Sequence, residues 1–302
     1  MDIGINGSGL LANPSLGALT ADITSAEDDN FASYWLAQTG GVDALTVFAA
    51  HGNTGSAMQL GTAVIPTWTT HPQVLAGQAL TTQAAVNGRL VLGLGLAHEP
   101  SVTGRWKMTW ERPVRQMMDF LDVLQPLITE GRVNHEGYFW SYEGEIPLLE
   151  GPTPKVMIAA LGDQMLKLAG ARTDGTILWC VGAKTIADHI APAINDAAEK
   201  AGRPQPSIVC SIPVWVTDDP APARDFLAQI LSVYAELPSY RRMLDIEGLH
   251  GLGELSLVGT EAEVTERIAE IAASGATDFT AVPMGGNPHE IARTRAILRI
   301  VR

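Results

Sequence analysis

The seven histidines are the residues of this sequence best suited to move a proton or to hold a metal ion. They are His51, His71, His98, His135, His189, His250 and His289. No two of them are two or four residues apart, the spacings that place metal ligands on one face of a strand or helix. The sequence also lacks a G-x-S-x-G nucleophile motif. It therefore predicts no metal site and favours an enzyme whose reactivity comes from a bound cofactor.

The predicted strand ends are rich in small residues instead. They read Gly61-Thr62-Ala63, Gly93-Leu94-Gly95 and Ala159-Ala160-Leu161-Gly162. Small side chains let a flat ring approach the backbone closely, and glycine accepts unusual dihedral angles. The same residues would also fit the narrow interior of a barrel, so both interpretations stay open.

The segment AALGDQMLKLAG (159–170) predicts a strand that runs through Gly162 directly into an amphipathic helix. The free amides of Gly162 to Met165 would then form the positive end of a helix, which attracts anions. The alternative is that Asp163 only caps the helix. Both interpretations remain open at this stage.

Short β-like runs alternate with longer helical patterns along the whole chain. The predicted strands are 2–7, 33–38, 58–66, 89–96, 155–161, 175–181, 207–216 and 278–284. The predicted helices are 15–29, 71–87, 111–130, 163–173, 184–201, 220–235, 261–274 and 287–300. Eight strands alternating with eight helices predict an α/β fold, a (β/α)8 TIM barrel, in one domain over residues 1–302. An open doubly wound sheet is the alternative.

Three stretches interrupt this alternation. Residues 97–110, which are rich in Trp and basic residues, form an insertion after the fourth strand, and residues 132–150 predict a hairpin before the fifth strand. Residues 236–256 show no clear pattern. In a barrel the loops after the strands carry the active site, so Gln38–Gly41, Ala63–His71 and Gly95–Ser101 become places to expect function.

Composition limits the classes of partner. The 302 residues carry a formal net charge of −13, which disfavours nucleic acids and anionic membranes. Cys180 and Cys210 suit a reducing compartment and buried strand positions. No apolar run has the length of a membrane span, and the N-terminus lacks the basic region of a secretory signal. We expect a soluble, cytoplasmic protein that acts on a small molecule.

Three motifs give the chain a resemblance to a known family. They are LGTAVIPTWTTHPQVLAGQALTTQAAVNGRLVLGLG (60–95), KVMIAALGDQMLKLAGARTDGTIL (155–178) and LVGTEAEVTERIAEIAASGATDF (257–279). In this order and at these separations they resemble the luciferase-like flavin and deazaflavin oxidoreductases over nearly the whole length. The resemblance implies a luciferase-like (β/α)8 barrel that binds coenzyme F420 or FMN at the carboxyl ends of its strands. Members most similar to this chain are generally F420-dependent.

The resemblance also implies roles for individual residues. Ala63 and Val64 match a bulge, often with a non-proline cis peptide, that lies behind the cofactor ring. Residues 160–164 match the stretch around the cofactor tail and phosphate, and His98 and Ser101 match positions beside the cofactor. The predicted cofactor-binding set is Gln38, Thr62, Ala63, Val64, Gly95, His98, Ser101, Ala160, Leu161, Gly162, Asp163, Gln164 and Met165.

The chain departs from the sugar-phosphate dehydrogenases of this family. Those have a carboxylate where His98 stands and a histidine where this chain reads AQTGG (37–41). Their acid and base residues therefore cannot be transferred, and His98 is the one predicted catalytic residue. Trp68, Trp106 and Trp110 are expected to line an apolar substrate pocket or to pack the loops.

The functional prediction is an F420-dependent oxidoreductase that transfers a hydride between the deazaflavin C5 and a small, largely apolar organic substrate. An FMN-dependent luciferase-like monooxygenase and a cofactor-binding barrel with little catalysis are the alternatives. The resemblance further implies a homodimer.

Overall fold

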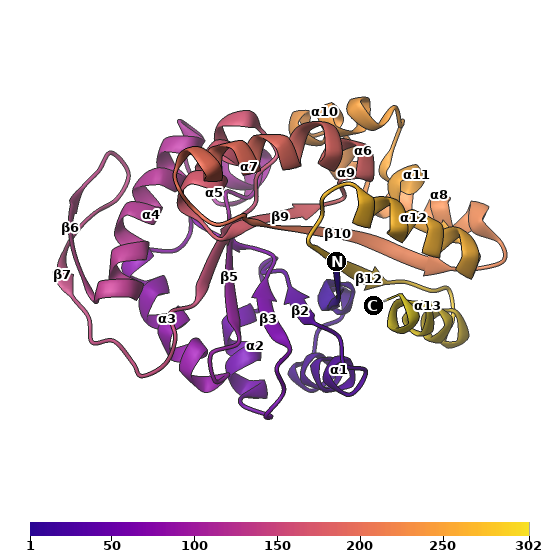
Figure 1. Ribbon diagram of the computed structural model, residues 1–302, viewed down its shortest axis with the longest axis horizontal. Coiled ribbons are helices and arrows are strands. Elements are labelled where there is room, and N and C mark those ends of the chain that lie inside the picture. Colours follow the sequence, from indigo (N-terminus) through magenta and orange to yellow (C-terminus); the bar gives the residue numbers. More distant parts are fainter. Residues whose placement is uncertain (302) are drawn as a thin grey trace. The chain divides into compact units, whose positions relative to one another are not determined.

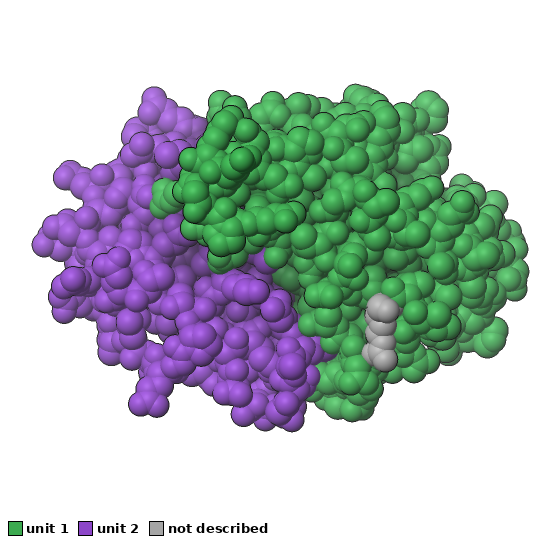
Figure 2. Space-filling view, viewed as in Figure 1, with its two compact units in different colours: residues 1–35, 160–302 green, residues 36–159 purple. Residues whose placement is uncertain are grey.

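The computed structural model describes residues 1–301 (Figure 1). The chain divides into two compact units (Figure 2). Unit 1 contains Met1–Trp35 and the segment that begins at Ala160, and unit 2 contains Leu36–Ala159. Each unit has parallel strands and its own buried apolar residues. The single domain over residues 1–302 stays a prediction.

Unit 1 alternates strands with helices. Its elements are β1 (Asp2–Asn6), η1 (Gly7–Ala12), α1 (Leu16–Asp28), β2 (Ser33–Leu36), α5 (Asp163–Arg172), β9 (Gly175–Trp179), α6 (Ala183–Thr185), η3 (Ile186–Ile190), α7 (Ala191–Lys200), β10 (Ser207–Val216), α8 (Pro220–Ile230), α9 (Ser232–Ala235), α10 (Pro238–Glu247), α11 (Leu252–Leu255), β11 (Leu257–Gly259), α12 (Glu261–Ala273), β12 (Asp278–Pro283) and α13 (Pro288–Ile300).

The ten-residue strand β10 organises unit 1. On one side it pairs with β12, which in turn pairs with β1, and β1 pairs with β2, all in parallel. On the other side its first half pairs with β9 and its last three residues pair with β11. Every β10 residue after Ser207 is buried, as expected for a parallel strand covered on both faces.

Unit 2 contains α2 (Ala44–His51), β3 (Gln59–Thr62), β4 (Ile65–Pro66), α3 (Pro72–Ala85), β5 (Leu90–Gly95), η2 (Pro100–Arg105), α4 (Pro113–Glu130), β6 (Arg132–Glu136), β7 (Ser141–Glu145) and β8 (Lys155–Ile158). All six residues of β5 are buried. This strand pairs in parallel with β3 and β4 on one side and with β8 on the other.

The structure confirms the predicted hairpin and most of the predicted strands and helices. Within residues 132–150, β6 and β7 form an antiparallel ladder beside α4 (Figure 1). The insertion at 97–110 contains η2, a turn of π-helix. The predicted strand 58–66 is present as β3 and β4, separated by Ala63 and Val64.

The predicted alternation of single strands with single helices is wrong in two places. Helix α2, between β2 and β3, was not predicted, because ALTVFAAH is apolar on most of its surface and shows no helical period. The stretch without a clear pattern at 236–256 contains α10 and α11 and leads into β11. These elements are short, and short patterns are hard to separate from loops by periodicity.

Helix ends follow the local sequence closely. Thr260 and Glu263 form the capping box at the start of α12, and Asn287 caps α13 with proline in its first turn. In the part of the chain that the structure describes, no helix combines the length and hydropathy that crossing a bilayer requires.

Candidate functional site

The strand end formed by β3, β4 and β5 in unit 2 contains the predicted ring-binding residues. Gly61 pairs with Val91 and Ile65 with Leu94, so the β3–β4 chain carries one more residue than β5 between these pairs. This is a β-bulge. The peptide between Ala63 and Val64 is cis, as the resemblance implied.

The hydroxyl of Thr62 holds this bulge against β5. It donates to the carbonyl of Gly93 and accepts from the Gly93 amide, each at 2.8 Å, and Thr62 is fully buried. The side chain therefore replaces ladder bonds that the bulge interrupts. A contact between Thr62 and a cofactor stays a prediction, and its hydroxyl is already used.

Close packing explains Gly95 at the end of β5. A Cβ at Gly95 would overlap the side chain of Val64 and lie 3.7 Å from the Cβ of Ala159. Ala63 and Val64 are half-buried, and Gly95 is buried beside them. A small-residue surface thus lies at the carboxyl end of these strands.

His98 and Ser101 belong to the same turn after β5. The His98 carbonyl accepts from the amide of Ser101 at 2.9 Å and from the amide of Val102 at 3.0 Å. Burial lowers the pKa of the His98 imidazole below its ordinary value. The folded protein therefore favours the neutral form of the His98 imidazole.

Gln38 lies in a pocket of unit 2 with a volume of about 340 Å³. Ile65, Thr69, Thr70 and His71 are among its lining residues. The Oε1 atom of Gln38 is buried and has no hydrogen-bond partner among the described residues. An unpaired buried acceptor is costly, so this atom is suited to a ligand that carries an N–H or O–H donor.

In unit 1, the start of α5 contains the other predicted binding segment. Gly162 is the N-cap residue, and no side chain makes a capping hydrogen bond there. The structure thus contradicts the alternative that Asp163 caps the helix. The Asp163 carboxylate is mostly exposed and faces Arg242 at 3.5 Å and His189 Nδ1 at 3.7 Å.

His189 fixes the turn before α5. Its Nε2 lies 2.8 Å from the carbonyl oxygen of Leu161 and must donate, because a carbonyl only accepts. Ala160 and Met165 are buried on either side of this turn, whereas Gln164 is exposed. Neither His189 nor Arg242 was predicted as a site residue, because each lies far along the chain from the start of α5.

Two other predicted candidates have structural partners. His71 caps α3 by accepting from the amide of Gln73 at 3.2 Å. Trp68 is buried and packs against Trp110 and Phe139, with ring centres 5.6 and 5.7 Å away. These contacts favour loop packing over a substrate contact for Trp68.

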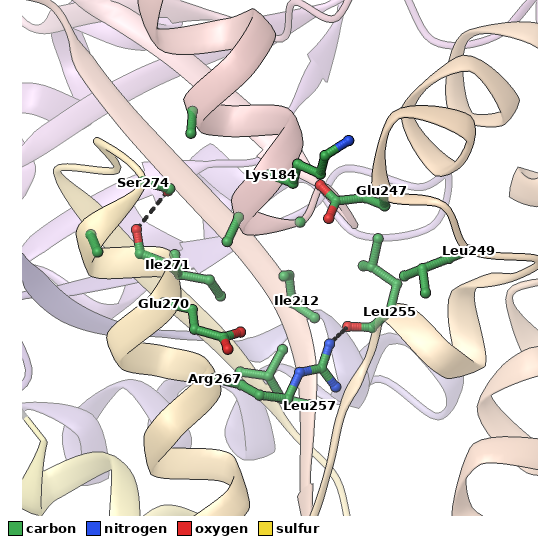
Figure 3. A pocket seen from close by; sticks show the side chains of 14 residues that line it. Lys184, Ile212, Glu247, Leu249, Leu255, Leu257, Arg267, Glu270, Ile271 and Ser274 are labelled. Atoms are coloured by element: carbon green, nitrogen blue, oxygen red, sulfur yellow. Dashed lines mark hydrogen bonds between the residues drawn. The ribbon is translucent and has the colours of Figure 1, made fainter.

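A larger cavity in unit 1, about 470 Å³, contains none of the predicted residues (Figure 3). Its polar side chains mostly bind backbone groups. Arg267 donates to the carbonyls of Leu255 and Ser256, and Lys184 donates to that of Ile246. Glu247 accepts from the Thr185 amide. These groups attach neighbouring helices to each other, so the cavity is a weaker candidate site.

Comparisons with known proteins support the family that the sequence motifs predicted. The family model described as luciferase-like monooxygenase matches residues 4–278. An uncharacterized protein of Mycobacterium tuberculosis is 28% identical over 258 residues, covering 80% of this chain and 75% of the relative. An F420-dependent glucose-6-phosphate dehydrogenase of Gordonia bronchialis is 30% identical over 189 residues, covering 59% of this chain and 55% of the relative.

Solved structures confirm the fold. An F420-dependent secondary alcohol dehydrogenase in complex with an F420-acetone adduct has a TM-score of 0.78 at 17% identity, covering 100% of this chain and 98% of that one. The oxygenating constituent of 3,6-diketocamphane monooxygenase from Pseudomonas putida, in complex with FMN, has a TM-score of 0.76 at 15% identity, covering 100% and 97%. Such identities show the fold alone, and the predicted luciferase-like (β/α)8 barrel is correct.

Replacing Thr62 with valine should destabilise unit 2 by about 2–3 kcal/mol, because the buried amide and carbonyl of Gly93 lose their partner while the shape is kept. Thr62→Ser retains the hydroxyl and should recover most of the loss. Urea denaturation of the three proteins measures this. Equal stability of Thr62→Val and wild type would contradict the role assigned to the hydroxyl.

His98 should make stability depend on pH. Its folded pKa is depressed, so the unfolded chain takes up a proton first as the pH falls. Relative to His98→Gln, the wild-type free energy of unfolding should be unaffected by this group above the unfolded pKa of about 6.5 and should decline below it. Urea denaturation at pH 7.5, 6.5 and 5.5 tests this. Parallel pH profiles for the two proteins would exclude a buried neutral His98.

Proposed function

We propose that this chain, which belongs to the luciferase-like monooxygenase family, is an oxidoreductase that uses the deazaflavin coenzyme F420. In the proposed reaction a hydride passes between C5 of the coenzyme and a carbon of a small, largely apolar organic substrate. The choice of F420 is supported by relatives of about 30% identity that are named F420-dependent glucose-6-phosphate dehydrogenases. The proposal includes a homodimer, as the resemblance implies, and a cytoplasmic location, as the composition indicates.

The observation that carries this proposal is the bulged strand end in unit 2. Gly95 allows the Val64 side chain to pack directly over β5, and Ala63 adds only a methyl group. A surface of this kind suits a flat ring that lies against the backbone. The first turn of α5 in unit 1 is proposed to hold phosphate, because its amides lack a side-chain cap and carry the positive end of the helix dipole.

When bound, F420 would supply the hydride chemistry that the side chains lack. This chain's residues would orient the substrate, exclude water and move the accompanying proton. His98 is proposed as the proton acceptor when a substrate hydroxyl is oxidised, because burial lowers its pKa and so favours the neutral imidazole, the form that takes up a proton. Gln38 Oε1 is proposed to accept a hydrogen bond from the substrate, because it is buried without a partner among residues 1–301.

An FMN-dependent monooxygenase is the second candidate. The similar solved structures include an FMN complex that covers 100% of this chain, as the F420 complex does. F420 is favoured because relatives of 30% and 32% identity carry names that specify it. A sugar-phosphate substrate is not carried over from those names, because this chain lacks the histidine and carboxylate expected at 37–41 and 98.

Fluorescence titration of the purified apo-protein against F420 and, separately, FMN tests the cofactor. We expect an F420 dissociation constant in the micromolar range or below, and at least tenfold weaker binding of FMN. A preference for FMN would favour the second candidate function, an FMN-dependent monooxygenase. Binding of neither would remove the proposed cofactor site.

Gly162→Val tests the proposed phosphate subsite. An added Cβ there meets no atom within 4 Å, and the backbone, at φ −87° and ψ 152°, accepts any residue. We expect an unchanged fold and at least tenfold weaker F420 binding, because the side chain would occupy the space above the α5 amides.

Gly251→Val is the matched control. Gly251 is also an extended N-cap glycine with open space around a Cβ, but it begins α11. Both variants lose the same capping preference, so circular dichroism and melting temperature should change equally. Equal F420 affinity in the two variants would argue against a phosphate at α5.

A further inference from the structure

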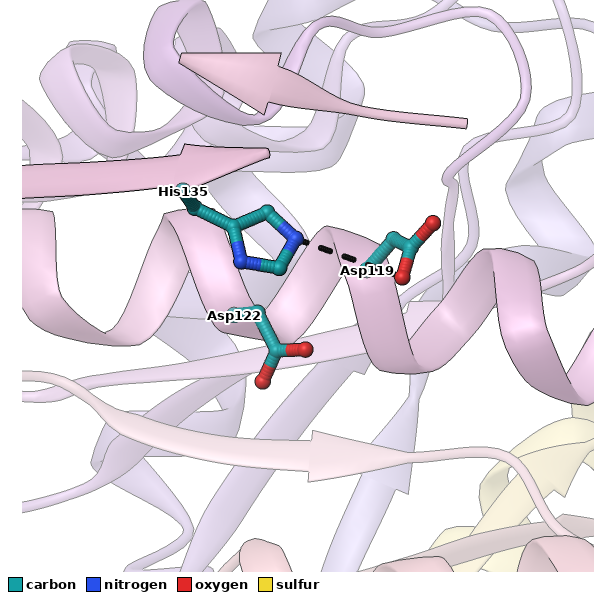
Figure 4. A group of neighbouring side chains, drawn as sticks. All are labelled: Asp119, Asp122 and His135. Atoms are coloured by element: carbon teal, nitrogen blue, oxygen red, sulfur yellow. Dashed lines mark ion pairs between the residues drawn. The ribbon is translucent and has the colours of Figure 1, made fainter. Parts of the chain in front are cut away.

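Three potential metal ligands meet in unit 2, outside the proposed cofactor site. Asp119 and Asp122 lie one turn apart on α4, and His135 projects from β6 towards them (Figure 4). One ligand atom of each lies within 4.8 Å of the other two. The Asp119 side chain is completely buried, and that of His135 is 19% exposed.

Two atoms of this cluster have unused hydrogen-bonding capacity. Asp119 Oδ2 accepts from the amide of Phe139 at 2.8 Å. Asp119 Oδ1 and His135 Nε2, 4.0 Å apart, are both buried and have no hydrogen-bond partner among the described residues, although Oδ1 forms an ion pair with Arg115 at 2.7 Å. Leaving the His135 nitrogen unsatisfied costs about 1–3 kcal/mol. A ligand that bonds to both atoms would remove this cost.

Gly137 keeps the two atoms facing each other. A Cβ at this position would lie 2.6 Å from His135 Nε2 and 2.9 Å from Asp119 Cγ. Any larger residue would therefore enter the cluster. The glycine in the hairpin turn therefore leaves space between the imidazole of His135 and the buried carboxylate of Asp119.

We propose that Asp119, Asp122 and His135 bind a divalent transition-metal ion of the zinc type. An imidazole nitrogen with two carboxylates favours zinc over magnesium or calcium, which prefer oxygen ligands alone. Three protein ligands leave a fourth position for water. Tetrahedral ligands at zinc distances are about 3.4 Å apart, so the three groups must approach each other by up to roughly 1.4 Å on binding.

Arg115 is the competitor of the metal in this site. Its Nε lies 2.7 Å from Asp119 Oδ1, one turn earlier on α4, and its side chain is 49% exposed. The contact is an ion pair without hydrogen-bond geometry. The Asp119 carboxylate is fully buried, so losing the guanidinium alone would leave a buried charge uncompensated. A bound metal ion supplies a positive charge in its place, and the half-exposed Arg115 side chain can then move into solvent. Removing Arg115 should therefore strengthen metal binding.

A bound ion would connect α4 to the β6–β7 hairpin. Alternate residues of both hairpin strands are exposed, and none is fully buried. The ion would add two coordinate bonds from α4 and one from β6 at this junction. Its role is thus to fix the hairpin, and it is independent of the proposed cofactor.

Zinc titration of the full-length protein by calorimetry, with Co²⁺ absorption as a second readout, tests the site. We expect one equivalent to bind in the micromolar range and the melting temperature to rise by a few degrees with saturating zinc. Asp122→Asn and His135→Gln should each weaken binding at least tenfold, and Arg115→Gln should strengthen it several-fold.

His250→Gln is the control, because it removes an exposed imidazole from unit 1 and should leave zinc affinity unchanged. Melting temperatures without metal show whether each variant is folded. The proposal is overturned if wild type binds no zinc, or if His135→Gln binds as tightly as wild type. It is also overturned if Arg115→Gln weakens binding, since Arg115 would then support the site and not compete with it.

Discussion

The buried hydroxyl of Thr62 is the interaction on which the strand end in unit 2 depends. At this point β3 leaves its ladder with β5, and the amide and carbonyl of Gly93 would lose their partners. One side chain satisfies both groups, so the chain can bulge at Ala63 and Val64 and return to pairing at Ile65. The small-residue surface of the proposed ring site follows from this arrangement, because the bulge sets Val64 over Gly95.

Unit 1 stabilises its proposed binding turn in a different way. The turn at Leu161–Gly162 lacks a capping side chain and is fixed instead by His189, from the π-helical turn η3. Arg242, from α10, lies beside the exposed carboxylate of Asp163. Because the α5 amides are not used by a cap, they stay available to an anion.

Few side chains at these strand ends can carry a reaction alone. Burial lowers the pKa of His98, and Gln38 presents a buried acceptor without a hydrogen-bond partner among the described residues. Such a set can orient a substrate and move one proton, and it fits an enzyme whose cofactor transfers the electrons. The hairpin, with Asp119, Asp122 and His135 at its base, lies in unit 2 and has polar groups of its own. A metal ion there would affect the stability of the hairpin, because its ligands join α4 to β6.

Local physics was enough to determine much of this protein from its sequence. Runs of six to ten residues predicted the strands, and the Thr260–Glu263 box and Asn287-Pro288 predicted helix starts. The motifs at 60–95, 155–178 and 257–279 predicted the family, and the first of them predicted the bulge. Tertiary structure alone decided the contacts of His189 with Leu161, of Thr62 with Gly93, and of His135 with Asp119. These partners are 16 or more residues apart, and hydrophobic periodicity carries no information about which distant polar groups meet. The apolar helix α2 was missed because it shows no helical period, and the short helices at 238–255 were missed because periodicity hardly separates short helices from loops.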